Sequence, residues 1–145
     1  MNQPWADIVA IEQVLYRYAH VLDRGTLQEV MPLFHPDAVL TVDSGGDTSR
    51  HVGATAAAAW LQDHHYDNAG RIRNMRHKIS TPLIDVDGDT ATAVSYMDAD
   101  GVDTANDRGR LTVGRYEDVF ARSGDGWLIM ERTLIVTDRH RFAEG

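Results

Sequence analysis

The chain contains no cysteine, and this absence removes several kinds of chemistry at once. Disulfides, thiolate nucleophiles and thiolate metal sites are all excluded. Basic charge is also scarce, because 14 Lys and Arg face 22 Asp and Glu and give a formal net charge of −8. Such a chain repels phosphate backbones and anionic lipids. We therefore expect neither nucleic acid nor membrane among its partners.

Long apolar runs are missing as well. No segment approaches the roughly 20 apolar residues that span a bilayer. The first seven residues, Met-Asn-Gln-Pro-Trp-Ala-Asp, lack a basic stretch followed by an apolar run, so a cytoplasmic location is the expectation. With 145 residues, the chain has the size of a single domain, 1–145. A domain of this size buries roughly two-thirds of its unfolded surface and can hold a pocket as well as a core.

The sequence pattern predicts that the first half of the chain is mainly helical. Between Asp7 and Leu22 apolar residues recur every three or four positions, as on one face of an amphipathic helix. The other elements expected here are a short helix over 27–34, a strand over 38–42, a loop at 44–47, and an alanine-rich helix from 54 to 61 that extends as far as 64 or 65.

The sequence pattern beyond Arg71 predicts strands joined by turns. The expected strands are 73–86 and 90–97, joined by a turn at Asp87-Gly88, then 111–121 and 127–137, joined at 123–126, with a connection over 98–108 and a loosely held tail from 138. Helices first and antiparallel strands after is an α+β order. A sheet that curls around helices on one side leaves a cone whose open mouth is lined by inward side chains.

Two residues stand where structure alone does not explain them. Asp23 lies at the end of the first helix, where a carboxylate faces the negative end of the helix dipole. His77 shares the apolar side of a strand with Met75 and Ile79, where an imidazole needs a partner. Asp23 could instead be a helix-end carboxylate held by Arg24, and His77 a satisfied core histidine. Together, however, they would form an oriented imidazole able to abstract a proton from a small organic molecule.

The chain resembles the SnoaL-like branch of the nuclear transport factor 2-like superfamily over nearly its whole length. The segments that carry the resemblance are Arg17-Tyr18, Leu22-Asp23-Arg24-Gly25, Leu33-Phe34-His35-Pro36-Asp37-Ala38, His77, Asp87-Gly88-Asp89 and Gly124-Asp125-Gly126-Trp127. The resemblance implies a cone-shaped, curved antiparallel sheet packed on N-terminal helices, a cystatin-like α+β barrel. It is the fold of scytalone dehydratase, ketosteroid isomerase, bile-acid dehydratase, hexachlorocyclohexane dehydrochlorinase and small polyketide cyclases.

The resemblance also implies roles for single residues. The dehydratases and the dehydrochlorinase use an Asp-His dyad, whose places are taken here by Asp23 and His77. A tyrosine five residues before the aspartate of the bile-acid dehydratase selects Tyr18, as does the Arg-Tyr pair of the isomerases. The second acid of the isomerases lies near the position of Asp118. Their base is a carboxylate after the first strand, and the nearest match, Asp43, is one residue out of step.

These observations lead to a hypothesis of function. The chain would be a cofactor-independent lyase that carries out a dehydratase-type β-elimination on a small, apolar cyclic or polyketide-like molecule. His77 would be the base, Asp23 its orienting partner, and Tyr18 a group that polarises a carbonyl or leaving group. Isomerase or polyketide cyclase chemistry begins with the same proton removal. A non-catalytic ligand-binding or dimerisation module is the alternative from a different class, and the resemblance implies a homodimer or homotrimer.

The remaining candidates are assigned to the wall of the cone. Phe34, Trp60 and Tyr96 are expected to line it, and Asp118 is either an inward acid or an outward surface carboxylate. The cluster Asp63-His64-His65-Tyr66-Asp67 looks like a set of metal ligands, but adjacent histidines point apart on a helix. We interpret it as a solvated helix end and expect neither a metal nor a cofactor.

Overall fold

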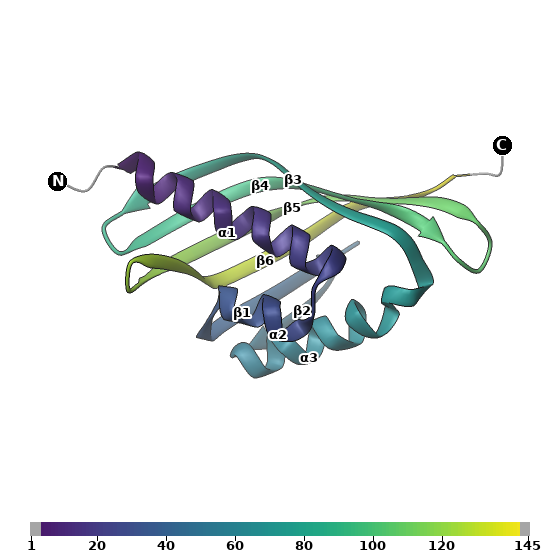
Figure 1. Cartoon of the computed structure of the whole chain (residues 1–145), viewed down its shortest axis with the longest axis horizontal. Coiled ribbons are helices and arrows are strands. Elements are labelled where there is room, and N and C mark those ends of the chain that lie inside the picture. The colour runs from purple at the N-terminus through teal and green to yellow at the C-terminus, as the bar shows by residue number, and fades with distance from the viewer. Residues whose placement is uncertain (1–3, 143–145) are drawn as a thin grey trace.

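The computed structural model describes residues 4–142, and its helices lie on one face of a six-stranded sheet (Figure 1). The helical elements are α1 (Pro4–Arg24), α2 (Leu27–Val30), α3 (Ala54–His64) and the 3-10 helices η1 (Met31–Leu33) and η2 (Tyr66–Arg71). The strands are β1 (Phe34–Ser44), β2 (Asp47–Val52), β3 (Ile72–Asp87), β4 (Thr90–Asp103), β5 (Arg108–Ser123) and β6 (Gly126–Arg141). Among these elements no helix is long and apolar enough to cross a membrane.

The strands form one curved sheet in the order β2-β1-β6-β5-β4-β3. Strands β3 to β6 pair antiparallel in sequence, as does the β1–β2 hairpin. The α+β fold with a curved sheet packed on N-terminal helices is therefore confirmed. Two details differ from the expectation: β1 runs parallel to β6, which makes the sheet mixed, and the edge strands β2 and β3 do not meet, so the cone is unclosed.

The sheet is longer at one end than the sequence pattern predicts. The segment 98–108, expected to be a connection, is the end of β4, a turn and the start of β5, and the tail expected from 138 continues β6 to Arg141. These extensions pair with one another, Asp100 with Leu111 and Leu111 with His140. They reach beyond the helices (Figure 1), so neither face is fully buried and the sequence shows no clean alternation there. Strand β2 was missed for the same reason, because it is an exposed, polar edge.

Helix α1 is held to the sheet by its apolar stripe. Ile11 and Leu15 are fully buried in one core with Phe120 and Ile129. Each large apolar side chain buried in this way contributes roughly 1.5–3 kcal/mol. At the other end of the stripe Leu22 is also buried, so the last turn of α1 is pressed against β3. This packing places Asp23, the next residue, against β3.

Strand β3 is bent by two irregularities. Its pairing with β4 shifts between Arg73 and Arg76, where Asn74 has a φ of 56°, and again near Thr81, with a φ of 47°. Bulges of this kind bend a strand and re-aim its side chains. The backbone of β3 passes so close to Gly101 that a Cβ there would overlap the Ile72 side chain. Beyond the first bulge, alternate residues point inward, and His77 is among them as predicted.

Candidate active site

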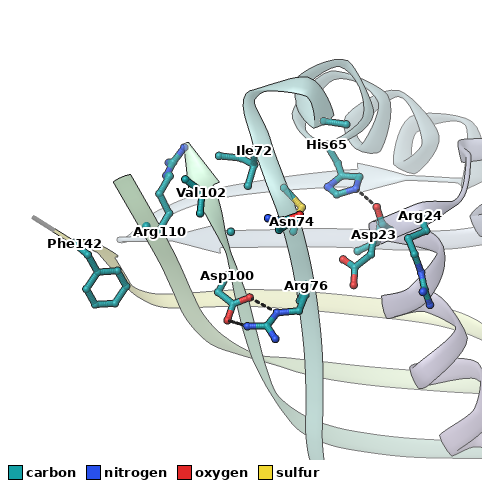
Figure 2. Close-up of a pocket in the computed structure, with 15 residues that line it drawn as sticks. Asp23, Arg24, His65, Ile72, Asn74, Arg76, Asp100, Val102, Arg110 and Phe142 are labelled. Carbon is teal, nitrogen blue, oxygen red and sulfur yellow. Dashed lines mark hydrogen bonds and ion pairs between the residues drawn. The ribbon is translucent and has the colours of Figure 1, made fainter. Parts of the chain in front are cut away.

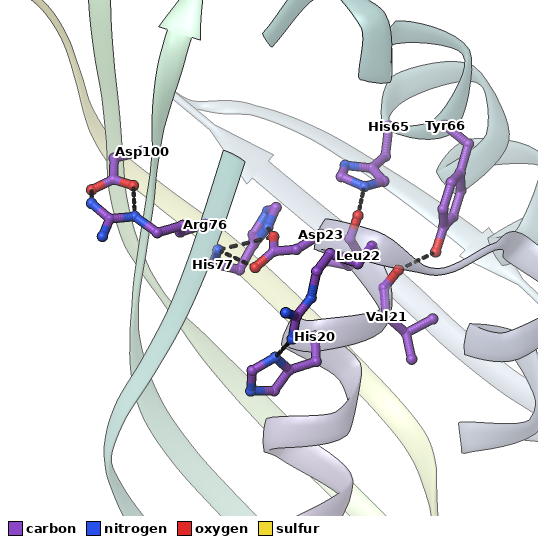
Figure 3. A network of polar contacts seen from close by, with 10 residues as sticks. His20, Val21, Leu22, Asp23, His65, Tyr66, Arg76, His77 and Asp100 are labelled. Carbon is purple, nitrogen blue, oxygen red and sulfur yellow. Dashed lines mark hydrogen bonds and ion pairs between the residues drawn. The ribbon is translucent and has the colours of Figure 1, made fainter. Parts of the chain in front are cut away.

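Asp23 and His77 lie in direct contact at the junction of α1 and β3 (Figure 3). The Nδ1 atom of His77 is 2.7 Å from Oδ1 of Asp23. The backbone N–H of His77 also donates to both carboxylate oxygens, each at 3.0 Å. The two side chains are 12% and 11% exposed. The carboxylate at the helix end thus finds three hydrogen bonds on the neighbouring strand, which offset its position at the negative end of the dipole.

This geometry fixes the tautomer of the imidazole. A carboxylate only accepts hydrogen bonds, so Nδ1 of His77 carries a proton that it donates to Asp23. In the neutral ring the lone pair then belongs to Nε2, which has no hydrogen-bond partner among residues 4–142. The ring is therefore held with its basic nitrogen available to a small molecule.

His77 opens onto a cavity inside the cone. This inner cavity has a volume of about 270 Å³ and is lined on its apolar side by Leu22, Trp60, Leu61, Met97 and Leu134. Asp23 does not line it and instead borders a groove of about 690 Å³ at the mouth of the cone (Figure 2). The carboxylate thus lies behind the imidazole, and the imidazole faces the apolar space. Apolar pockets with a few converging polar groups are the usual form of small-molecule sites.

Tyr18 also borders the inner cavity and connects it to a second ion pair. Its ring packs edge-on against Phe34 and Tyr116. The guanidinium carbon of Arg132 lies 4.2 Å from the centroid of the Tyr18 ring and 4.0 Å from that of Tyr116. Burial raises the pKa of Tyr18, and burial raises that of Tyr116 further. Both phenols therefore stay protonated near neutral pH and can donate.

Asp118 faces inward but lies behind this layer. It accepts two hydrogen bonds of 2.8 Å from Arg132, and both side chains are fully buried. Burial raises the pKa of Asp118, and the charge and hydrogen bonds of Arg132 oppose that rise. Burial would lower the pKa of Arg132, but the Asp118 carboxylate raises it above its ordinary value. Asp118 borders none of the cavities next to the dyad, so the pair belongs to the floor of the site.

Of the other predicted wall residues, one is in place and two are not. Trp60 lines the inner cavity, with its ring stacked 4.6 Å from that of His64. Phe34 is buried in the core beneath Tyr18 and does not reach the cavity. The expectation for Tyr96 is wrong: the parity of β4 turns Ser95 and Met97 inward, so Tyr96 lies on the outer face, 62% exposed.

His65 is a site residue that sequence analysis missed. It is half-buried, its Nε2–H donates to the backbone oxygen of Leu22 at 2.6 Å, and its ring lies edge-on to that of His77 at 5.5 Å. Burial lowers the pKa of His65, and the nearby His77 adds to this effect. The cluster from Asp63 to Asp67 was interpreted as a solvated helix end. This interpretation holds for exposed Asp63 but fails for His65. No sequence signal separates the two, because the difference arises from a contact across 43 positions.

No group of three or more His, Asp and Glu side chains in the described part of the chain is placed to hold a metal ion. What converges on the inner cavity is an oriented imidazole, a neutral phenol and an apolar wall. This set can take up and return a proton next to a bound apolar molecule.

Comparison with known proteins agrees with this architecture. A family model for the SnoaL-like domain matches residues 3–133. A protein of Novosphingobium aromaticivorans named for scytalone dehydratase has 22% identity and a TM-score of 0.82, over 98% of this chain and 91% of that one. A type 2 hexachlorocyclohexane dehydrochlorinase has 13% identity and a TM-score of 0.81, over 97% and 91%.

A third solved structure, a protein of Novosphingobium aromaticivorans with a cystatin-like fold, has 23% identity and a TM-score of 0.72, over 92% of this chain and 84% of that one. No curated protein matches the chain. At these identities the solved structures establish the fold, and the family model covers most of the chain. The chain belongs to the SnoaL-like family.

Proposed function

We propose that the protein is a cofactor-independent lyase that eliminates water, or a similar leaving group, from a small apolar cyclic molecule. The observation that carries the proposal is the 2.7 Å contact between Asp23 and His77 beside a hollow lined with apolar side chains. The similarity in fold to a protein named for scytalone dehydratase and to a dehydrochlorinase supports the same class of reaction.

The reaction would proceed as a β-elimination in which His77 acts first as base and then as acid. Nε2 removes a proton from the carbon next to a carbonyl, and the electrons of that C–H bond form the new double bond. The bond from the adjacent carbon to oxygen breaks, and the imidazolium returns the proton to the departing hydroxide, which leaves as water. Asp23 keeps Nδ1 protonated and stabilises the imidazolium between the two transfers.

Tyr18 would polarise the carbonyl. Its phenol borders the same cavity and stays protonated, because burial raises its pKa. A neutral donor in an apolar site stabilises the negative charge that develops on a carbonyl oxygen as the proton leaves. Tyr116, which borders the cavity as well, is a second phenol of this kind.

An isomerase mechanism has less support from the geometry. The isomerases need a carboxylate base, and Asp43, the nearest match, accepts a bond from the Gly46 N–H in the β1–β2 turn. Their second acid would be Asp118, which is bound to Arg132 beneath the cavity floor. Proton removal by His77 remains common to both reactions, so the product separates them.

The test uses two ketones that fit a small apolar cavity. With 1-tetralone deuterated next to the carbonyl, loss of deuterium to solvent measures proton abstraction alone, and with 3-hydroxy-1-tetralone, appearance of 1-naphthol measures elimination. We expect the wild-type protein to accelerate both reactions. His77→Gln should slow them roughly 100- to 10,000-fold, the usual contribution of general acid–base catalysis.

His35→Gln is the matched control. His35 also lies near a carboxylate, with Nδ1 4.0 Å from Asp37, but it is on β1 and borders none of the cavities next to the dyad. This variant should keep full activity. Wild-type rates equal to those of buffer for both ketones, with binding retained, would favour a ligand-binding module instead.

A further inference from the structure

The mouth of the inner cavity is basic, although the protein as a whole is acidic with a net charge of −8. Three arginines from separate elements border the cavity or the cleft beside it. Arg110 on β5 borders the inner cavity, the mouth groove and a side cleft of about 320 Å³. Arg71 at the end of η2 borders the side cleft, and Arg139 on β6 borders the inner cavity. Figure 2 shows Arg110 beside Ile72 and Val102, away from Asp23.

These arginines keep hydrogen-bond donors that the described residues do not use. The guanidinium of Arg71 makes no hydrogen bond or ion pair within residues 4–142. Arg110 forms an ion pair with Asp103 at 3.7 Å, a distance too long for a hydrogen bond, so this carboxylate leaves the N–H donors of Arg110 unused. Arg139 donates to the hydroxyl of Ser44 at 2.8 Å, which brings no negative charge. Each of the three guanidinium groups therefore keeps donors that are free within residues 4–142.

The carboxylates that line the mouth groove and the inner cavity, Asp23 and Asp100, are already bound to other side chains. Asp100 borders the inner cavity, but it accepts two hydrogen bonds from Arg76 and one from Lys78 (Figure 2). These cations lower its pKa and leave it surrounded by positive charge. Asp23 is bound to His77. The side cleft itself has no acidic residue in its lining.

We infer that the ligand of the inner cavity carries an anionic oxygen group, carboxylate or phosphate, that binds at the mouth to Arg110 and Arg71. Its apolar body would contact Leu22 and Trp60 inside, while the anion stays in the half-open mouth, where it need not be fully desolvated. Guanidinium groups match both kinds of anion with paired hydrogen bonds. Arg139 provides a third positive charge on the neighbouring strand β6. This inference rests on the proposed function only in that both place the ligand in the inner cavity.

The experiment compares probes that differ only in the head group: 2-naphthoate, 2-naphthyl phosphate and the neutral 2-naphthamide. Binding is measured by calorimetry with the full-length protein at low salt. We expect at least one anion to bind roughly three- to tenfold more tightly than the amide. Arg110→Gln and Arg71→Gln should each reduce that ratio, and their combination should abolish it. High salt should reduce it as well, because the mouth is open to solvent.

Two controls separate this inference from other effects. Arg115→Gln removes the same charge from the outer face of β5, where Arg115 pairs with Glu117 at 3.0 Å, and should leave the ratio unchanged. His77→Gln should lose proton abstraction and keep the ratio, so a failure of the proposed function does not decide this test. The tighter of the two anions identifies carboxylate or phosphate as the group. Equal binding of anions and amide, no binding of any probe, or a ratio insensitive to the Arg71 and Arg110 variants overturns the inference.

Discussion

Two carboxylates, Asp23 and Asp118, are each paired with a nitrogen-bearing side chain and differ in almost every other respect. Asp23 contacts His77 at 2.7 Å, and both side chains keep about a tenth of their surface open. Asp118 contacts Arg132 at two points of 2.8 Å, and both are fully enclosed. One pair ends in an imidazole nitrogen with a free lone pair, and the other ends in a guanidinium that only donates hydrogen bonds.

The comparison shows that partner and solvent access decide what a buried carboxylate does. In the Asp23 pair, His77 borders an open cavity, so its Nε2 is accessible to a small molecule. In the Asp118 pair, the rings of Tyr18 and Tyr116 cover the guanidinium, and its Nη1 has no hydrogen-bond partner within the described residues. Such a pair has a fixed charge state and holds the floor of the site in one arrangement.

The largest effect is expected from Asp118→Asn. This change leaves the charge of Arg132 buried without a counter-ion, so the free energy of unfolding should fall by roughly 3–5 kcal/mol. Urea unfolding measures the loss. The double variant Asp118→Leu with Arg132→Met should be less destabilised than the single one, because it leaves no unpaired charge. A loss below about 1 kcal/mol in the single variant would contradict the assignment of this pair to the structural floor.

Asp23→Asn should have the opposite profile. Asparagine can still accept from the backbone N–H of His77, so stability should change by about 1 kcal/mol or less. The hydrogen bond to Nδ1 loses its negative partner, and the rate of proton abstraction from deuterated 1-tetralone should fall roughly 10- to 100-fold. NMR of deuterium loss from 1-tetralone measures the rate, and urea unfolding of the same variant measures the stability. A large loss of stability with an unchanged rate would reverse the comparison.

Sequence reasoning reached the first pair and not the second. Asp23 and His77 were found because each conflicts with its local surroundings, and the strand parity that turns His77 inward holds in the structure. The face of β5 that carries Asp118 was left undecided, because both faces of that strand contain apolar and charged residues. Arg132 gave no signal at all, since its burial depends on meeting Asp118 on the neighbouring strand.

The mouth of the cone was the hardest part to predict. The fold follows from the helix stripe, the turns and the alternation of the central strands. The extended ends of β4, β5 and β6 lie beyond the helices, so apolar and polar residues do not alternate there. Their sequence therefore predicted a connection and a loose tail rather than strands. The arginines of the mouth come from these ends and from η2, and His65 lies between α3 and η2. Their proximity is set by bulges and long-range contacts that leave no local pattern.

Tyr18 belongs to both regions, and two substitutions separate its roles. Tyr18→Phe keeps the ring over Arg132 and should change the free energy of unfolding by less than about 1.5 kcal/mol, while the rate falls roughly three- to tenfold through loss of the hydroxyl donor. Tyr18→Leu also removes the ring, and the lost cation–π contact should cost about 2 kcal/mol more. Equal stability of the two variants would show that the ring does not support the buried pair.

The smallest effect concerns His65, which makes the dyad region sensitive to acid. Burial lowers the pKa of His65 from its ordinary 6.5, so the unfolded chain takes up a proton at a higher pH than the folded chain. The unfolded state therefore holds more protons as the pH falls below about 6.5, and stability drops in that range, whereas above it the stability is fully present.

His65→Gln retains a donor for the Leu22 carbonyl and removes this titration. When the pH is lowered from about 7.5 to 5.5, its free energy of unfolding should decrease by less than that of the wild type. His20→Gln is the control, because His20 is exposed and its side chain hydrogen-bonds only to Arg24 within residues 4–142. Since the Asp118–Arg132 pair is common to all three proteins, the difference between their pH profiles reports on the dyad side alone. Parallel profiles for wild type and His65→Gln would mean that burial of this ring does not couple protonation to folding.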